Sequence, residues 1–298
     1  MFIVKYRKLF VSISAVLVVL SIAFMFIFGM NFGIDFKGGS LLEVEYTASD
    51  RPTQDTFEEI LQPLNLGGML VQPVGNYGYS IKMRDITDAE KNEILDTLGT
   101  TVVEKSFTSI GPSVGAELVR KSIISFILVS LGIIFWIAFS FRKVSKPVSS
   151  WKYGLIAIVS LIHDTVIAAG AFALIGHLTG AEVDTLFVVA ILTTLGLSVS
   201  DTIVVFDRIR ENIHVGHWKT FEETVGKSLE QVFTRSIITS STVIIVLLSL
   251  VFFGPSSTRI FSIVLTIGMF FGTYSSIFLA SPLLVMVNNL QGKGKKNK

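Results

Sequence analysis

The residues of this chain that are best suited to chemistry are a few polar side chains inside long apolar stretches. Asp201 lies in the apolar run Thr185 to Phe206, and Thr194 and Ser198 precede it by seven and three residues. These spacings place all three side chains on one face of a helix. A charged side chain inside a bilayer costs at least ~2.5 to 3.5 kcal/mol on insertion scales, so it needs a partner, water or a function. The stripe therefore predicts a polar track that ends at Asp201.

Arg235 is the cationic counterpart that the sequence offers. It opens the next apolar run, and Thr239 and Thr242 continue its helical face four and seven residues later. If the two spans are antiparallel neighbours, the Asp201 carboxylate and the Arg235 guanidinium can meet. Making or breaking that ion pair would switch Asp201 between holding and losing a proton. Residue types alone leave two alternatives open, a static salt bridge and an Arg235 side chain that extends to the membrane surface.

A second buried pair, His163 and Asp164, lies in the run Tyr153 to Leu178. The pair falls near the middle of the bilayer, and Ser160 precedes Asp164 by one helical turn. A proton relay and a structural hydrogen bond are equally consistent with these residues. Asp207 and Arg208 close the run that holds Asp201, where they are expected to mark the edge of the membrane and not to take part in catalysis.

Several chemistries are excluded by what the sequence lacks. None of the 298 residues is Cys, so disulfides, thiolate metal sites and cysteine nucleophiles are ruled out. The sequence has no phosphate-binding loop, no HExxH and no GxSxG motif. We therefore expect a protein that is not an enzyme, with no metal and no cofactor, and with protons as the coupling ion.

Composition and charge point to a membrane protein. Hydrophobic residues make up 50% of the chain and charged residues 16%, against ~25% charged in an ordinary soluble domain. Residues 31–120 carry 14 acidic and 7 basic side chains, or −7, so that the rest of the chain carries +9 of the total of +2. The excess basic residues adjoin apolar runs. This placement predicts contact with membrane lipid and excludes a nucleic-acid surface.

Six apolar runs reach the length of ~20 residues that a helix needs to cross a bilayer. We expect six transmembrane helices, with helix 1 in residues 1–30, helices 2 to 6 in residues 121–290 and a basic tail in residues 291–298. The runs are Leu9 to Met30, Ser122 to Phe141, Tyr153 to Leu178, Thr185 to Phe206, Ser236 to Thr258 and Ile260 to Leu290.

Lysine and arginine set the predicted orientation. They cluster before the first run, between the second and third, between the fourth and fifth, and after the sixth, whereas the short opposite loops carry only Arg259. The positive-inside rule then places both termini in the cytoplasm of a multi-pass protein of the cell membrane. The first run is longer than the core of a signal peptide and no Ala-x-Ala site follows it, so we expect an uncleaved anchor.

Residues 31–120 have the pattern of a small α+β domain on the outer side of the membrane. Strands are predicted at Leu41 to Tyr46, Met69 to Val74, Tyr79 to Arg84 and Thr101 to Phe107. Helices are predicted at Thr53 to Leu64 and from Thr87 to near Gly99, where Glu90 completes a capping box. The order βαββαβ indicates a ferredoxin-like fold.

One further helix is expected near residues 220–234. Thr220 and Glu223 form a capping box, and four apolar side chains follow at helical spacing on one face. We expect this amphipathic helix to lie along the cytoplasmic surface and to lead into the fifth span. Those side chains are Phe221, Val225, Leu229 and Val232.

Several motifs resemble one known family. After the first run, the stretch from Phe32 to Gly39, which contains Gly33, Asp35, Gly38 and Gly39, resembles the GIDFxGG signature of SecF in the SecD/SecF family of protein-export membrane proteins. Family members usually have Arg-Thr where this chain has Arg235-Ser236, a change that keeps the arginine. The other matching segments are Ile110 to Gly115, His163-Asp164, Ser200 to Asn212, Thr234 to Ser236 and Gly272 to Ser276.

This resemblance implies a function and partners. The protein would pair with SecD beside the SecYEG channel and use the proton gradient to draw a preprotein across the membrane after SecA has pushed it. The family is related to the proton-driven resistance-nodulation-division transporters, and its span-four Asp and span-five Arg couple protons. Those residues correspond here to Asp201 and Arg235. Gly38 and Gly39 are expected to serve backbone geometry.

Two functions from other classes are alternatives. Half of a proton-coupled small-molecule efflux transporter would share Asp201, but it would need large outer domains, which this chain lacks between the third and fourth runs. A non-catalytic scaffold for the translocase would tolerate neutral residues at both charged sites.

Overall fold

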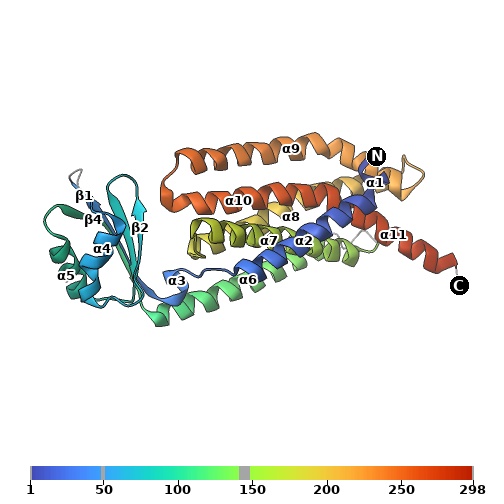
Figure 1. Cartoon of the computed structure of the whole chain (residues 1–298). Helices are drawn as coiled ribbons and strands as arrows, with labels where there is room; N and C mark the ends of the chain where they lie inside the picture. Colours follow the sequence, from blue (N-terminus) through green and yellow to red (C-terminus); the bar gives the residue numbers. More distant parts are fainter. Residues whose placement is uncertain (1, 48–50, 141–147, 297–298) are drawn as a thin grey trace. The chain divides into compact units, whose positions relative to one another are not determined.

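The computed structural model describes residues 2–47, 51–140 and 148–296. The chain divides into two compact units, Met1–Asn31 with Ser125–Lys298, and Phe32–Ile124. The first is a helix bundle and the second contains the only β-sheet among the described residues (Figure 1). The bundle contains both carboxylates that the sequence singled out, Asp164 and Asp201.

The bundle contains the predicted transmembrane helices. Among the described residues, six helical segments are long and apolar enough to cross a membrane, which confirms the expected fold class. A short helix α1 (Phe2–Lys5) precedes them. The first five of the six segments are α2 (Arg7–Phe28), α6 (Pro112–Ser140), α7 (Ser150–Thr179), α8 (Thr185–Val215) and α9 (Phe221–Phe253). The sixth is α10 (Ser256–Ser275), which continues through the π-helix η2 (Ser276–Ala280) into α11 (Ser281–Lys296).

The fifth span begins earlier than the apolar pattern indicated. The predicted amphipathic segment near 220–234 is not a separate surface helix, because it is the first part of the continuous helix α9. No proline occurs between Phe221 and Phe253, so no residue there forces the helix to end. Val225 and Leu229 are buried in the bundle core, as their spacing predicted. The helix ends at Phe253, where Gly254 and Pro255 lead into α10.

Helix α10 is the central packing element of the bundle. It packs against α7, α8 and α9, while α2 packs against α7 (Figure 1). Two glycines allow the close approach of α10 to α8, since a Cβ atom on Gly268 would collide with Thr194 and one on Gly272 would lie 3.1 Å from Ser198 Cβ. Small residues commonly allow such contacts between transmembrane helices. Helix α6 contributes little to this packing. Of its residues from Ser125 onward whose burial is described, Ile137 is the one that is buried.

The α+β unit has the predicted order of elements. Its antiparallel sheet has the order β2-β3-β1-β4, and two helices connect the strands as a ferredoxin-like fold requires. A bulge interrupts the β1–β4 pairing between Glu43 and Val44. The elements are β1 (Gly39–Tyr46), α4 (Gln54–Leu61), the 3-10 turn η1 (Gln62–Leu64), β2 (Leu70–Val74), β3 (Gly78–Met83), α5 (Asp88–Leu98) and β4 (Val102–Ile110).

The core of this unit forms between the helices and one face of the sheet. Leu42 and Ile81 project from the strands, and Phe57 of α4 and Ile94 of α5 cover them, all four being fully buried. Both helices begin with a threonine whose hydroxyl accepts a backbone N–H bond, Thr53 for α4 and Thr87 for α5. Such caps stabilise a helix by about 1 kcal/mol.

Two adjacent glycines start the sheet. A short helix α3 (Ile34–Lys37) follows Gly33 and has Asp35 in its first turn. Gly38 and Gly39 then adopt φ values of +78° and +135°, which residues with a side chain rarely adopt. A Cβ atom on Gly39 would also lie 2.7 Å from the Met83 carbonyl oxygen. The backbone at this position therefore requires glycine.

Candidate functional site

Asp201 lies where three helices of the bundle meet. It is half-buried on α8, and its Oδ2 accepts hydrogen bonds from Thr273 Oγ1 of α10 at 2.9 Å and from Ser240 Oγ of α9 at 3.3 Å. The two hydroxyl oxygens are themselves 2.5 Å apart. At this distance one hydroxyl donates to the other, so Asp201, Ser240 and Thr273 form a hydrogen-bonded group that joins α8, α9 and α10 at one point.

The predicted contact between Asp201 and Arg235 is not present in this structure. Among the described ion pairs none joins the two residues, and Arg235 is exposed on α9. Arg235 and Ser240 are five positions apart, which turns them about 140° from each other around a helix. Since Ser240 faces Asp201, Arg235 points to the outer side of α9.

The same helical phase corrects the polar track predicted on α9. Thr239 and Thr242 share the face of Arg235 and are exposed, and the Thr242 hydroxyl bonds back to the Ile238 carbonyl of its own helix. After Arg235, the buried polar side chains of α9 are Ser236 and Ser240, which are both 3% exposed. The polar side chains of α9 that face the bundle are therefore these two serines and not the predicted threonines.

Thr194 and Ser198 of α8 are buried, but they do not lead to Asp201. The Thr194 hydroxyl donates to the Ala190 carbonyl at 2.9 Å, within its own helix. Ser198 donates to Asp164 of α7. The predicted stripe is therefore not one continuous track, because Thr194 bonds within α8 and Ser198 contacts Asp164 of α7.

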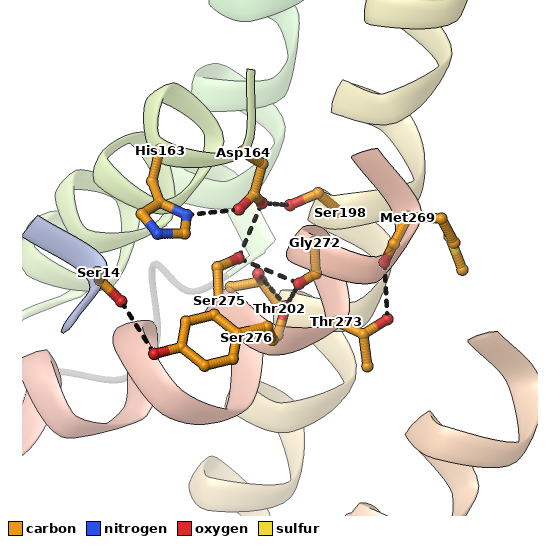
Figure 2. Close-up of polar contacts among 11 residues, drawn as sticks. Ser14, His163, Asp164, Ser198, Thr202, Met269, Gly272, Thr273, Ser275 and Ser276 are labelled. Carbon is orange, nitrogen blue, oxygen red and sulfur yellow. Dashed lines mark hydrogen bonds and ion pairs between the residues drawn. The ribbon is translucent and has the colours of Figure 1, made fainter. Parts of the chain in front are cut away.

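A second polar cluster surrounds Asp164, which has no solvent exposure. Figure 2 shows its carboxylate between His163 on one side and Ser198 on the other. His163 Nδ1 lies 2.8 Å from Oδ1, while Ser198 Oγ and Ser275 Oγ both donate to Oδ2, the latter at 2.8 Å. The carboxylate is thereby bonded to helices α8 and α10 and to its own neighbour in α7.

Helix α10 touches both carboxylates through residues that the sequence reasoning did not assign. Thr273 reaches Asp201 and Ser275 reaches Asp164, while Ser276 Oγ lies 2.8 Å from Thr202 Oγ1 of α8. The signal was visible as a run of hydroxyl residues in an apolar span. The π-helix η2 begins at Ser276, and π-helical turns often occur at functional sites.

The predicted edge residues Asp207 and Arg208 lie beyond Asp201 on α8. Arg208 Nε donates to Gln231 Oε1 of α9 at 2.6 Å, and Asn212 Nδ2 donates to the same oxygen at 2.8 Å. Asp207 lies 3.8 Å from Arg210 of its own helix and is largely exposed. The two hydrogen bonds to Gln231 join α8 to α9 outside the two carboxylate clusters.

Neither cluster has the residues of a metal site. Within residues 2–47, 51–140 and 148–296, no group of three or more His, Asp or Glu side chains could hold a metal ion. What the two clusters can do is bind and release protons at carboxylates whose hydrogen-bond donors come from neighbouring helices.

Comparison with known proteins identifies the family. The chain matches the family described as "Protein export membrane protein SecD/SecF, C-terminal" over residues 90–290, and the "SecD/SecF GG Motif" over residues 23–50. The chain belongs to the SecD/SecF family. Its C-terminal match contains both carboxylate clusters, and the GG motif contains Gly38 and Gly39.

Relatives within the SecD/SecF family match nearly the whole chain. "Protein translocase subunit SecF" of Thermobaculum terrenum is 40% identical over 96% of this chain and 94% of its own length. The protein of the same name from Anaerolinea thermophila is 36% identical over 94% of this chain and 92% of its own. A crystal structure of SecDF from Thermus thermophilus, a translocon-associated membrane protein, matches with a TM-score of 0.81 and 28% identity. It covers 96% of this chain, which spans 38% of that SecDF chain.

Proposed function

We propose that this chain is the SecF subunit of a protein export complex that uses the proton gradient to complete preprotein translocation through SecYEG. Its direct partner in this proposal is SecD, and SecA acts on the same preprotein only indirectly. The names of the relatives support the assignment to a translocase. The SecD partner is supported by the match of this chain to 38% of a SecDF chain, a protein whose name combines SecD and SecF.

The observation that carries the proposal is the position of Asp201 between α8, α9 and α10. Protonation would neutralise the carboxylate and weaken its charge-assisted bonds to Ser240 and Thr273. The three helices would then be free to shift relative to one another. One elementary charge moved through 100 mV yields about 2.3 kcal/mol, which changes a two-state equilibrium by about fiftyfold.

Arg235 belongs to this proposal as an alternative partner of Asp201. In the described state the carboxylate is held by hydroxyl groups, and the guanidinium lies on the outer side of α9. A rotation of α9 would bring Arg235 toward α8 in exchange for Ser240. The ionised carboxylate would then alternate between two sets of partners while the protonated form has little preference for either.

The experiment is export of a reporter preprotein into inverted vesicles that contain SecYEG, SecA, SecD and this chain. Native chain and Asp201→Asn are compared with and without a proton gradient. We expect the gradient-dependent increment to fall to background in the variant, because asparagine cannot exchange a proton. Asp96→Asn, the same chemical change at an exposed position of α5, should keep the full increment.

Complex formation with SecD is measured in the same vesicles. An Asp201→Asn variant that still binds SecD and still shows the full increment would make the carboxylate structural, and the chain a scaffold. Altered drug retention with unchanged preprotein export would instead favour an efflux function.

A further inference from the structure

The His163–Asp164 pair has a geometry that a static ion pair does not explain. Nδ1 of His163 is engaged with Asp164, whereas Nε2 is buried and has no hydrogen-bond partner among the residues that the structure describes. Figure 2 shows this second nitrogen turned away from Asp164. If Nδ1 donates its proton to Asp164, Nε2 of a neutral ring is the unprotonated nitrogen and has a free lone pair. A proton added at Nε2 would be a buried N–H without a partner, at a cost of about 1–3 kcal/mol, which neutralisation of the Asp164 carboxylate has to offset.

His163 lines a groove of about 410 Å³ between α2, α7, η2 and the start of α11, together with Ser14 of α2. The other side chains that line this groove are apolar. Ser14 Oγ lies 3.5 Å from the Tyr274 hydroxyl, and the Tyr274 ring is within 19° of parallel to the His163 ring at a centroid distance of 6.2 Å. His163 therefore adjoins polar side chains, Ser14 and Tyr274, that are not part of the Asp201 cluster.

On the other side of the pair, the hydroxyl of Ser275 has two possible acceptors. Its oxygen is 2.8 Å from Asp164 Oδ2 and 3.1 Å from the Gly272 carbonyl oxygen of α10. A hydroxyl carries one proton and donates it to one acceptor at a time. An ionised Asp164 attracts that proton, whereas a neutral Asp164 leaves it to the Gly272 carbonyl. Serine bonds to its own helix backbone in this way often bend the helix.

We propose that His163 and Asp164 form a second proton-binding pair, in which Nε2 of His163 accepts the proton and Ser275 transmits the charge state of Asp164 to α10. This inference rests on the proposed function and deepens it, because α10 also holds Asp201 through Thr273. The proton enters at Nε2, and Nδ1–H passes a proton to the Asp164 carboxylate, so that the pair gains one proton in total. Thr273 and Ser275, both in α10, then change their hydrogen bonds when Asp201 and Asp164, respectively, gain or lose a proton.

Other titratable groups that face the pair are few. From α2 and η2 the neighbouring polar groups are the hydroxyls of Ser14 and Ser276, which do not titrate in this range. On α8 and α10, the titratable groups within one helical turn of a residue that contacts the pair are Asp201, three residues after Ser198, and Tyr274, whose ring stacks on His163.

The experiment is a pH titration by infrared difference spectroscopy of the full chain with SecD in lipid vesicles. The carbonyl-stretching region of protonated carboxylic acids is followed in the native complex and in Asp164→Asn, Asp201→Asn and His163→Gln. We expect two titrating bands in this region that respond separately, one lost in Asp164→Asn and the other in Asp201→Asn. His163→Gln should move the midpoint of the Asp164 band by more than about half a pH unit.

Ser275 is tested through the link between the two bands. Asp164→Asn should shift the midpoint of the Asp201 band, and Ser275→Ala should abolish that shift. Ser262→Ala is the matched control, because Ser262 is buried in the same helix and its hydroxyl donates to the Thr258 carbonyl of that helix. The Ser262→Ala substitution should leave the midpoints of the Asp164 and Asp201 bands unchanged. Asp164→Glu, whose band should move in frequency, serves if the asparagine variant does not fold.

A complex in which no band depends on Asp164 would overturn the inference, since Asp164 would then keep one protonation state throughout. Unchanged midpoints of both bands in His163→Gln would show that His163 is not the proton acceptor and would also overturn the inference. Either result would leave the Asp201 band and the export experiment unaffected, so a failure here is distinct from a failure of the proposed function.

Discussion

Single residues determine how closely α10 packs on the carboxylate-bearing helix α8. Gly268→Ala would place a methyl group against the Thr194 side chain. Overpacking of this kind costs about 1–3 kcal/mol, so we expect a lower unfolding temperature for the full chain in detergent, followed by circular dichroism. Gly196→Ala is the control on α8, because a Cβ atom there meets no atom within 4 Å. Alanine should raise stability by up to about 1 kcal/mol at that position. Equal unfolding temperatures for the two variants would contradict this packing.

The identity of the buried residues in the bundle could be predicted from sequence, but their partners could not. Asp201 and Asp164 stand out because a charge in an apolar run is costly. The orientation of Arg235 does not follow from sequence in the same way. Lipid and bundle core are both apolar, so the apolar pattern of α9 does not show which face points inward. The orientation of α9 about its axis follows from Ser240, which contacts Asp201 of α8 and Thr273 of α10, and only the structure reveals these contacts.

Among the elements, those of the α+β unit followed the sequence most closely. Water on one side and a core on the other impose periods of 2 and 3.6 on the side chains, so strands and helices were located to within a few residues. The capping box at the start of α5 is one such element. Thr87 and Glu90 exchange hydrogen bonds there, and Arg84 also donates to Glu90. The Arg84 bond and the Thr87 backbone N–H together lower the pKa of Glu90 to about 2.

That shift predicts how the stability of α5 depends on pH. The pKa of Glu90 is lower in the folded state than its ordinary 4.5, so its contribution is complete above about pH 4.5 and is lost as pH falls toward about 2. We expect protection of the α5 amides against hydrogen exchange, corrected for intrinsic rates, to decline over this range in the full chain. Glu90→Gln should remove this part of the decline, whereas Glu93→Gln on the exposed side of α5 should retain it. An identical decline in the native chain and in Glu90→Gln would assign the effect to other carboxylates.

At the scale of the whole molecule, the proposed function depends on orientation. The α+β unit must lie on the side where the preprotein emerges, and the α8–α9 connection must lie on the opposite side. The distribution of lysine and arginine predicts this arrangement, with both termini in the cytoplasm. Because the chain contains no cysteine, an introduced cysteine is its only thiol and reports one position.

Two such positions test the orientation directly. Tyr77→Cys lies in the exposed turn between β2 and β3, and Lys219→Cys lies in the exposed connection before α9. In intact cells, a membrane-impermeant maleimide that reaches the outer face of the cell membrane should label the Tyr77→Cys protein at once. It should label the Lys219→Cys protein only after the membrane is permeabilised, and the native chain should stay unlabelled throughout. The reverse labelling pattern would place the α+β unit in the cytoplasm, where it could not draw a preprotein outward. The orientation of α8 in the membrane, and of Asp201 with it, would then be opposite to the one that the proposed coupling requires.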